Sequence, residues 1–453
     1  TDFLQGAMPP LREAGLRRRA GATATKSAFA VETDDNGEPI HVTNEGDFST
    51  LGEILRLLFG VTVLVTFGPF IACQIACCTL WEWVDKRTIN LIGFSTRLAE
   101  AVSPVTNHFV KSEKDGFMVL MLVLQGVLLP AWFFYELHLA TIHGVQWHRI
   151  FLYNLGRIGP MYMNFMYCYT LCHKEAHNFG NLFKQPYNRV FKFVFNRWVG
   201  VFHGVLPGVF TISHVFNHHK YDNGDKDVIC TILRPRDRFS SLVKFLPGFF
   251  AYASNVSTVQ SLIAEGKTAY ALQASLGTLY YLAIVSACAY VQPLFTLCTL
   301  VYAFVEGNVL LSVVQIGWHA FVDEDDPTND YINSTTIVDG VNFTLNEEYH
   351  VVHHQYAGAH WGKYVPLYEK HAEGYQACVP TIFQGLNLFE LYGMVVANAW
   401  DELADKFYHP LNPGLSKEEL ILVLKKRVRS SGKKLAATVG RTQRAKGDDV
   451  QYQ

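Results

Sequence analysis

The sequence predicts an all-α polytopic membrane bundle, with four core spans, an extra N-terminal span and a histidine-rich cap on one side. Charged residues are only 17% of the chain and apolar residues 49%, and the apolar residues occur in long blocks. A block of about 20 apolar residues matches a hydrocarbon core roughly 30 Å thick. In addition, nine of the eighteen histidines fall into four groups at or just after the ends of such blocks. The blocks predict the spans, and the histidines predict the cap.

The apolar blocks give the order of the spans. Residues 198–212 form a shorter block, which predicts a re-entrant or interfacial helix, and residues 243–264 are mixed, which predicts a helix on the membrane surface. The long spans pair into two hairpins, so each hairpin returns to the side that it leaves. The first block is therefore an extra span that places the N-terminus on the opposite face. The predicted long spans are residues 54–80, 116–139, 150–172, 268–291 and 294–318.

Composition divides the chain into five predicted parts. Residues 1–50 form a flexible leader. Within it, residues 9–26 carry five cations and one acid, a composition typical of an organelle-targeting or membrane-surface segment, with a solvated disordered leader as the alternative. Residues 51–115 hold the N-terminal span and an interfacial segment, and residues 116–361 form the membrane domain with the histidine groups. Residues 362–424 form C-terminal cap helices. Residues 425–453 form a basic tail, for which we expect contact with lipid headgroups or docking onto a partner protein.

Composition also excludes several classes of protein. The nine cysteines are odd in number and lie mostly inside apolar runs, which indicates small buried side chains in a reducing compartment rather than a disulfide framework. A formal net charge of −2 gives no reason to expect nucleic-acid binding. Glycine-rich nucleotide-binding loops are absent from the sequence.

The histidine groups have the spacing of metal ligands. Residues three or four apart share one face of a helix, so each group can direct two or three imidazoles to one point. Converging neutral imidazoles indicate a metal, and three of them with an open position would suit zinc. Eight or nine ligands are too many for one ion, whereas two ions with four or five ligands each fit, and nitrogen ligation admits iron. The groups are His173 and His177; His214, His218 and His219; His319; and His350, His353 and His354.

The position of the groups indicates where this metal chemistry takes place. Three groups follow the ends of apolar blocks, so they gather in one cap if these exits share one side of the bilayer. Cations flank the first two groups, which is compatible with a cap on the inner side; they are Lys184, Arg189, Lys192, Arg234, Arg236 and Arg238. A polynuclear iron centre beside a hydrocarbon phase predicts activation of dioxygen for attack on an unactivated C–H bond, in a site shielded from water.

The three boxes HxxxH, HxxxHH and HxxHH, separated by a long apolar hairpin, closely resemble those of the membrane fatty-acid desaturase/hydroxylase superfamily over roughly residues 150–361. The resemblance implies a di-iron centre on the cytosolic side of a four-helix transmembrane bundle. It implies that the eight histidines of the three boxes are ligands, and that His319, at the inner end of the last bundle helix, is the ninth. Gln315 occupies a position where the family has an amide, with asparagine the closer match, so we expect it to reach the metal through water or to support a ligand.

Several acidic residues lie next to the boxes. Carboxylates often orient metal-bound imidazoles through the far ring N–H, and we expect this role for Glu175, Asp227 and Glu347, with a solvated face as the alternative for the glutamates. Asp222 and Asp225 are expected to support ligands in the same way or to pair with arginine. Glu306 lies inside an apolar block about 20 Å along a helix from His319, too far to be a ligand. We expect it to line a substrate tunnel or to bond to a neighbouring helix.

The resemblance implies an O₂-dependent lipid desaturase that acts on a fatty-acyl or sphingoid chain, with two iron ions as cofactor and O₂ as co-substrate. A lipid or alkane hydroxylase on the same centre is the first alternative, and a desaturase-derived structural subunit of an organelle membrane complex is the second. The sequence lacks the His-Pro-Gly-Gly stretch of fused haem domains, so we expect a separate electron-donor protein of the cytochrome or ferredoxin type. Membrane lipids are expected partners. The expected location is the endoplasmic reticulum or a mitochondrial or plastid membrane.

Overall fold

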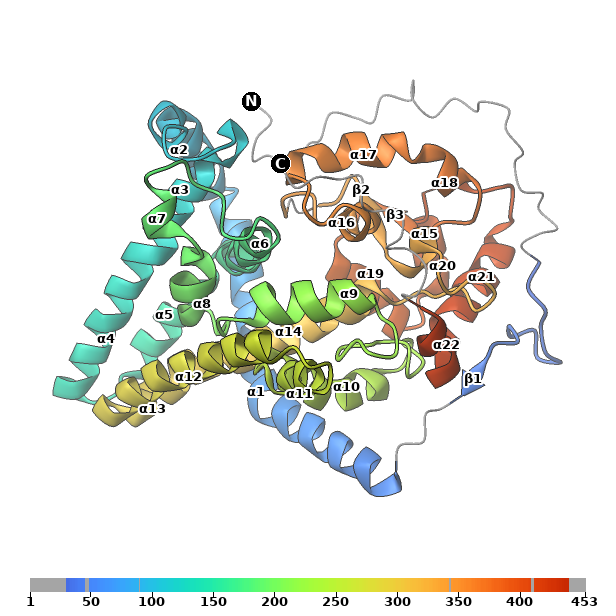
Figure 1. Ribbon diagram of the computed structural model, residues 1–453, viewed down its shortest axis with the longest axis horizontal. Helices are drawn as coiled ribbons and strands as arrows, with labels where there is room; N and C mark the ends of the chain where they lie inside the picture. Colours follow the sequence, from blue (N-terminus) through green and yellow to red (C-terminus); the bar gives the residue numbers. More distant parts are fainter. Residues whose placement is uncertain (1–29, 45–48, 89, 342–343, 409–410, 440–453) are drawn as a thin grey trace. The chain divides into compact units, whose positions relative to one another are not determined.

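The structure, a computed structural model, describes residues 30–44, 49–88, 90–341, 344–408 and 411–439 (Figure 1). The described residues are mostly helical, and their strands form only two short parallel pairs. These are β1 (Thr43–Asn44) with β4 (Ser431–Gly432), and β2 (Thr336–Val338) with β3 (Ile382–Gln384). This composition confirms the all-α class. Most of the predicted leader and the end of the basic tail lie outside the described residues.

Four helical segments are long and apolar enough to cross a membrane, with mean hydropathy between 1.5 and 2.2 in their most apolar windows. They correspond to four of the five predicted long spans, which confirms the polytopic architecture. The segments are α1 (Thr50–Asp85); Glu113–His143, which contains α3 (Gly116–Val123) and α4 (Leu129–His143); α12 (Thr268–Val291); and Pro293–Trp318, which contains α13 (Pro293–Thr296) and α14 (Tyr302–Trp318).

The third predicted long span, residues 150–172, is the one without such a segment, and it is interrupted in its middle. It consists of α5 (Trp147–Ile158), η4 (Pro160–Tyr162) and α6 (Met163–His177). Gly159 has φ +74°, and Pro160 has no N–H to donate to a continuing helix. The Asn164 side-chain N–H donates to the Gly156 carbonyl at 3.0 Å, which satisfies part of the opened backbone. Irregular backbone at membrane depth is tolerated when it is buried and bonded in this way.

The two weaker blocks also form helices with breaks. In residues 198–212, α8 (Gly200–Phe202) is followed by six residues, 203–208, and then by the π-helix η6 (Val209–His218). Gly204, with φ +79°, allows this turn, because a Cβ there would lie 2.4 Å from the backbone of Phe304. Residues 243–264 are covered by α10 (Phe239–Ala253) and α11 (Val256–Ala264).

The chain divides into two compact units. Unit 1 contains residues 1–58, 218–247 and 311–453, and unit 2 contains residues 59–217 and 248–310. The apolar spans belong mainly to unit 2, together with α2 (Leu91–Thr106), α7 (Asn188–Phe191) and the π-helices η3 (Leu124–Leu128), η5 (Phe195–Val199) and η7 (Leu297–Val301). The C-terminal helices belong to unit 1.

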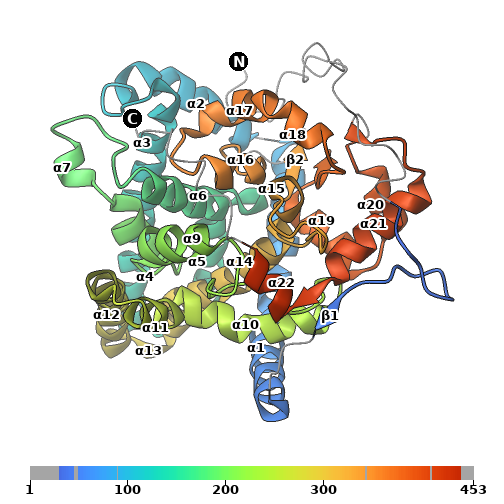
Figure 2. The same cartoon turned by 45° about the vertical axis from the view of Figure 1, so that its right-hand side comes forward.

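Unit 1 has its own apolar core. Leu391, Leu403 and Leu424, from three different helices, are fully buried in one cluster. In both cartoon views α19, α20 and α21 lie together (Figures 1 and 2). The short helices of this unit are α9 (His219–Tyr221), α15 (Asp330–Asn333), α16 (His350–Gln355), α17 (Tyr364–Lys370), α18 (Ala372–Gln376), α19 (Leu388–Val396), α20 (Trp400–Asp405), α21 (Lys417–Arg429) and α22 (Lys433–Thr438).

The helix α21 carries the first part of the predicted basic tail. A capping box starts it, since the Ser416 hydroxyl accepts from the Glu419 N–H and the Glu419 carboxylate accepts from the Ser416 N–H. Its cations are bound within unit 1: Lys425 and Arg429 both contact the Glu38 carboxylate, at 2.8 and 2.6 Å. These two cations therefore have a carboxylate partner within unit 1.

One ion pair lies inside the membrane part of unit 2. The Arg157 guanidinium on α5 pairs with the Glu306 carboxylate on α14, and both side chains are fully buried. The Asn154 side-chain oxygen accepts from the same guanidinium, while its amide donates to the Cys298 carbonyl in η7 at 3.0 Å. The expectation that Glu306 bonds to a neighbouring helix is confirmed. The pair sits beside the interruption at residues 159–162.

Candidate metal centre

Unit 2 brings together three of the predicted ligands. His173 and His177 lie one turn apart on α6, and His214 lies on η6. The Nε2 atom of His173 is 2.7 Å from Nε2 of His214 and 3.1 Å from Nε2 of His177. All three side chains are buried. The helical spacing of the first box thus has the predicted effect, since both of its imidazoles reach the same point.

Unit 1 brings together the other six predicted ligands. One ring nitrogen from each of His218, His319 and His354 lies within 4.8 Å of the others. The Nε2 atom of His350 is 3.4 Å from Nε2 of His319 and 3.2 Å from Nε2 of His354. A second close contact joins His353 and His219, whose Nε2 atoms are 2.9 Å apart.

Four of these imidazoles also contact a polar group through their second ring nitrogen, Nδ1. The contacts are His218 to the Asp227 carboxylate at 2.7 Å, His354 to the Asp222 carboxylate at 3.0 Å, His319 to the Asn333 carbonyl at 3.2 Å, and His353 to the Tyr364 hydroxyl at 3.0 Å. Carboxylates and carbonyls only accept, so Nδ1 of the first three rings carries the proton. Each of these rings therefore presents an Nε2 lone pair to its neighbours. Facing lone pairs repel one another unless a cation lies between them, and this donor set fits a metal ion.

The charges of the neighbouring groups are consistent with metal binding. Burial lowers the pKa of His319 well below its ordinary value, which keeps the ring neutral and able to coordinate a metal. Burial alone would raise the pKa of the Asp222 carboxyl, but His354 beside it holds that pKa well below its usual range. Asp222 therefore remains an anion that accepts from His354 Nδ1–H.

The predicted supporting residues have different environments. Asp227 is buried against His218 and also accepts from the backbone N–H groups of Asn223 and Ile229, which fix its orientation. Glu347 is buried before the third box. Gln315 lies one turn before His319, and within the described part of the chain its buried Nε2 has no hydrogen-bond partner.

Glu175 is bound to the start of η5 in its own unit. Its carboxylate accepts from the backbone N–H and the side-chain N–H of Asn196, each at 2.9 Å. Burial raises the pKa of Glu175 to about 7, although Asn196 and the guanidinium of Arg197 act in the opposite direction. This residue anchors residues 195–197 to the helix that carries the first box.

Tyr364 is a site residue that the sequence does not reveal. It begins α17, eleven residues after His353, and its fully buried hydroxyl contacts His353 Nδ1. No helical repeat links the two positions, because a 3₁₀ turn, η8 (Trp361–Lys363), lies between them. The nearest signal is the aromatic composition just after the third box.

Replacing Tyr364 by phenylalanine is expected to lower metal affinity by about 10-fold, because supporting contacts of metal-bound imidazoles typically contribute 10–100-fold. The measurement is a competition titration with a chelator, read by metal content. Tyr368→Phe is a matched control one turn further along α17, since within the described residues the buried Tyr368 hydroxyl has no hydrogen-bond partner. Equal affinities for the two variants would contradict the role given to Tyr364.

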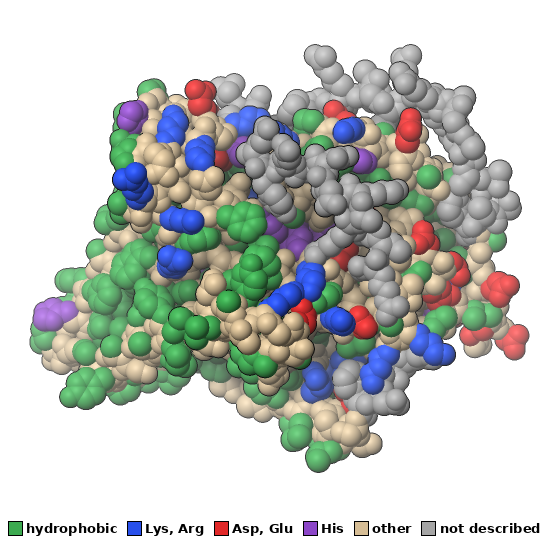
Figure 3. Space-filling model, viewed as in Figure 1, with side chains coloured by type: hydrophobic (Ala, Val, Ile, Leu, Met, Phe, Trp, Pro, Cys, Tyr) green, Lys and Arg blue, Asp and Glu red, His purple; other side chains and the backbone are tan. Residues whose placement is uncertain are grey.

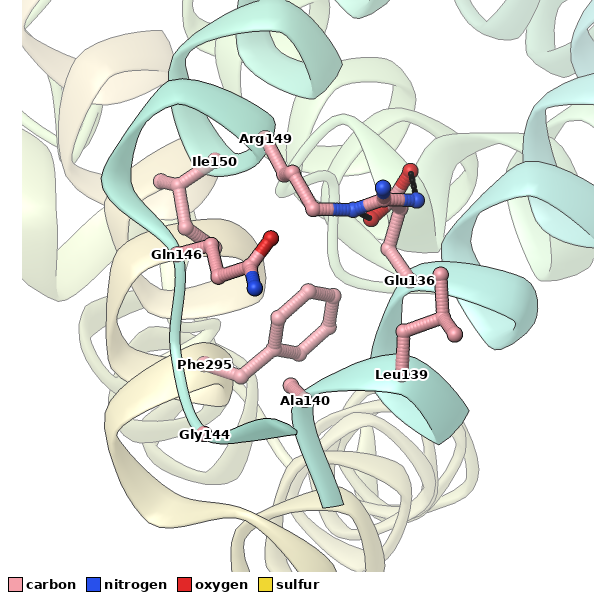
Figure 4. A pocket seen from close by; sticks show the side chains of 8 residues that line it. All are labelled: Glu136, Leu139, Ala140, Gly144, Gln146, Arg149, Ile150 and Phe295. Carbon is pink, nitrogen blue, oxygen red and sulfur yellow. Dashed lines mark hydrogen bonds and ion pairs between the residues drawn. The ribbon is translucent and has the colours of Figure 1, made fainter. Parts of the chain in front are cut away.

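A separate hollow lies in unit 2, between the end of α4 and the start of α5 (Figure 4). Its wall carries the ion pair of Glu136 and Arg149, and Phe295 contributes an apolar side. No histidine lines this hollow among the described residues. His173 and His177 lie at the other end of the α5–α6 segment, away from this hollow.

Comparison with known proteins gives one match. The family model described as fatty acid desaturase matches residues 155–385, which is about half of the chain and includes all four histidine groups. No curated protein and no solved structure matches the chain significantly.

Proposed function

Because the chain belongs to the fatty acid desaturase family of membrane oxidoreductases, we propose that it is an O₂-dependent lipid desaturase with a di-iron centre. It is an integral membrane protein with four apolar helices among its described residues. The proposed ligands of the two iron ions are His173, His177, His214, His218, His219, His319, His350, His353 and His354. Asp227 is the proposed support of His218, and Gln315, Glu175 and Glu347 are proposed as further supporting residues.

The observation that carries this proposal is the anchoring of imidazoles through Nδ1. In unit 1, Asp227 and Asp222 each fix one ring from behind, so that its Nε2 lone pair faces other imidazoles. Such second contacts set the tautomer and raise the basicity of the ligand. Histidines on a solvated surface would not need such hydrogen bonds at Nδ1.

The bound irons would supply reduction of O₂, with two electrons arriving from a separate donor. The overall reaction is –CH₂–CH₂– + O₂ + 2e⁻ + 2H⁺ → –CH=CH– + 2H₂O. The protein positions the ligands and excludes water, since His173, His214, His218 and His353 are all buried. The apolar spans keep the chain in the phase where its lipid substrate dissolves.

Two alternatives use the same observations. A hydroxylase on the same centre would insert oxygen into one C–H bond instead of removing two hydrogens. A structural subunit of a larger organelle complex would retain the fold without the metal.

We propose that the enzyme is located in the endoplasmic reticulum or in a mitochondrial or plastid membrane.

The test combines metal analysis and lipid profiling. The detergent-purified full chain is expected to contain about two iron ions, as the number of nitrogen ligands requires. Cells that express it are expected to gain a lipid with one more double bond than cells carrying an empty vector. A new hydroxyl group would support the hydroxylase instead. A chain without iron and without any new lipid would refute both enzymes and leave the structural subunit.

A further inference from the structure

A basic patch lies on unit 2 beside the first histidine box. Residues 178–200 contain four cations and no carboxylate. The patch consists of these four residues and one cation from a neighbouring segment, all of them exposed: Lys111, Lys184, Arg189, Lys192 and Arg197. Lys and Arg side chains gather over the region of α3 and α7 in Figure 3.

The members of the basic patch are held together by the backbone. The Lys111 N–H donates to the Leu182 carbonyl at 3.0 Å, and the Lys184 N–H donates to the Phe109 carbonyl at 2.8 Å. These bonds place the two segments side by side. The charged groups of Lys192 and Arg197 lie 5.3 and 5.0 Å from the centroid of one ring, that of Phe193.

The basic patch is attached directly to the helix that bears His173 and His177. Asn196, next to Arg197, donates two hydrogen bonds to Glu175, which lies between these histidines. Gly180, three residues after His177, is packed beneath Lys192, since a Cβ there would lie 2.8 Å from Lys192 Cγ. The hydrogen bonds between Asn196 and Glu175 therefore connect the patch directly to the helix of the first box.

Two exposed apolar side chains accompany the cations. Val190 on α7 is 77% exposed, and Phe179 is 45% exposed. A small apolar contact with a charged surround is the composition of a weak, transient interface, and complementary charge raises the rate at which such partners meet.

We propose that the basic patch is the docking surface for a small acidic protein that carries one electron at a time. This inference rests on the proposed function, because reduction of O₂ there requires two electrons from outside the chain. Two donor molecules each lose one electron, and the two protons come from water. The excess of cations fits an acidic partner, and the bonded path through Asn196 and Glu175 favours a donor to the metal centre over a purely lipid contact.

The test uses the full chain in phosphatidylcholine nanodiscs and two acidic probes, a b-type cytochrome haem domain and a [2Fe–2S] ferredoxin. Arg189→Glu with Lys192→Glu reverses two charges of the patch. Lys433→Glu with Lys434→Glu makes the same change on exposed cations of α22 in unit 1. Binding of each oxidised probe is titrated, and oxidation of each reduced probe is followed by stopped flow at low and high salt.

For at least one probe, we expect the patch variant to have an affinity and an oxidation rate at least about 10-fold lower than wild type at low salt. Its rate should also depend less on salt. The control variant should stay within about 2-fold of wild type in both quantities. Reduction of the irons by dithionite is expected to be unchanged in both variants. Equal binding of both probes to wild type and patch variant would overturn the docking surface. A difference seen only in nanodiscs with added anionic lipid would overturn it in favour of a headgroup site. Absence of dithionite-reducible iron in the wild type would instead refute the proposed function, while the binding titration would still decide on the docking surface.

Discussion

Replacing Glu306 by glutamine is expected to lower the free energy of unfolding by about 3–5 kcal/mol, which is the cost of leaving one partner of a buried ion pair uncompensated. The Arg157 guanidinium would remain charged, because arginine does not deprotonate in proteins. Both side chains are fully buried, so water cannot replace the lost carboxylate. The Asn154 oxygen and the new amide oxygen of the glutamine would offer the guanidinium only uncharged partners.

The free energy is measured by SDS titration of the detergent-solubilised protein. Glu82→Gln provides the control, since Glu82 pairs with Lys86 near the end of α1 and this lysine is 61% exposed. Removing such a partly solvated pair is expected to change stability by less than about 1 kcal/mol. The double variant Arg157→Met with Glu306→Leu should recover most of the stability, because apolar groups of similar volume can replace a buried pair. The same small loss in Glu306→Gln and Glu82→Gln would contradict this account.

Replacing His218 by alanine is expected to lower the iron content to about half or less and to reduce product lipid below detection. The change removes one ligand nitrogen and also leaves the buried Asp227 carboxylate without its imidazole partner. Both effects weaken metal binding, and loss of a supporting contact alone typically costs 10–100-fold in affinity. Iron content is measured on the purified chain and product in lipid extracts of expressing cells.

His143→Ala is the control for this variant, because His143 is exposed at the end of α4, a helix that carries no predicted ligand. It should retain the iron and the product of the wild type. Gel filtration of both variants verifies that they remain folded. Wild-type iron content and product in His218→Ala would refute the role of His218 as a ligand.

The local features of the site could be predicted because they depend on helical spacing. His173 and His177 reach one point because they are four residues apart on α6, and His350 and His354 do the same on α16. The start of α21 is local in the same sense, because its capping box, Ser416 with Glu419, can be read in the sequence.

Tertiary partners could not be predicted in the same way. Glu306 inside an apolar block signalled a buried charge, but Arg157 was not recognised as its partner, because this pairing depends on how α5 and α14 pack. Tyr364 reaches His353 only because the chain turns back between α16 and α17. The interruption of the third long span was also missed, since hydropathy averages over Gly159 and Pro160, whereas these two residues decide the backbone.

The interruption at residues 159–162 affects how the first box responds to its lipid environment. A transmembrane helix whose length does not match the bilayer adjusts by tilting or bending. Because α5 and α6 are separate rods joined at Gly159, α5 can change its tilt without imposing the same rotation on α6. The Arg157–Glu306 pair ties the end of α5 to α14 next to this joint. We therefore expect the geometry of His173 and His177 to depend little on bilayer thickness.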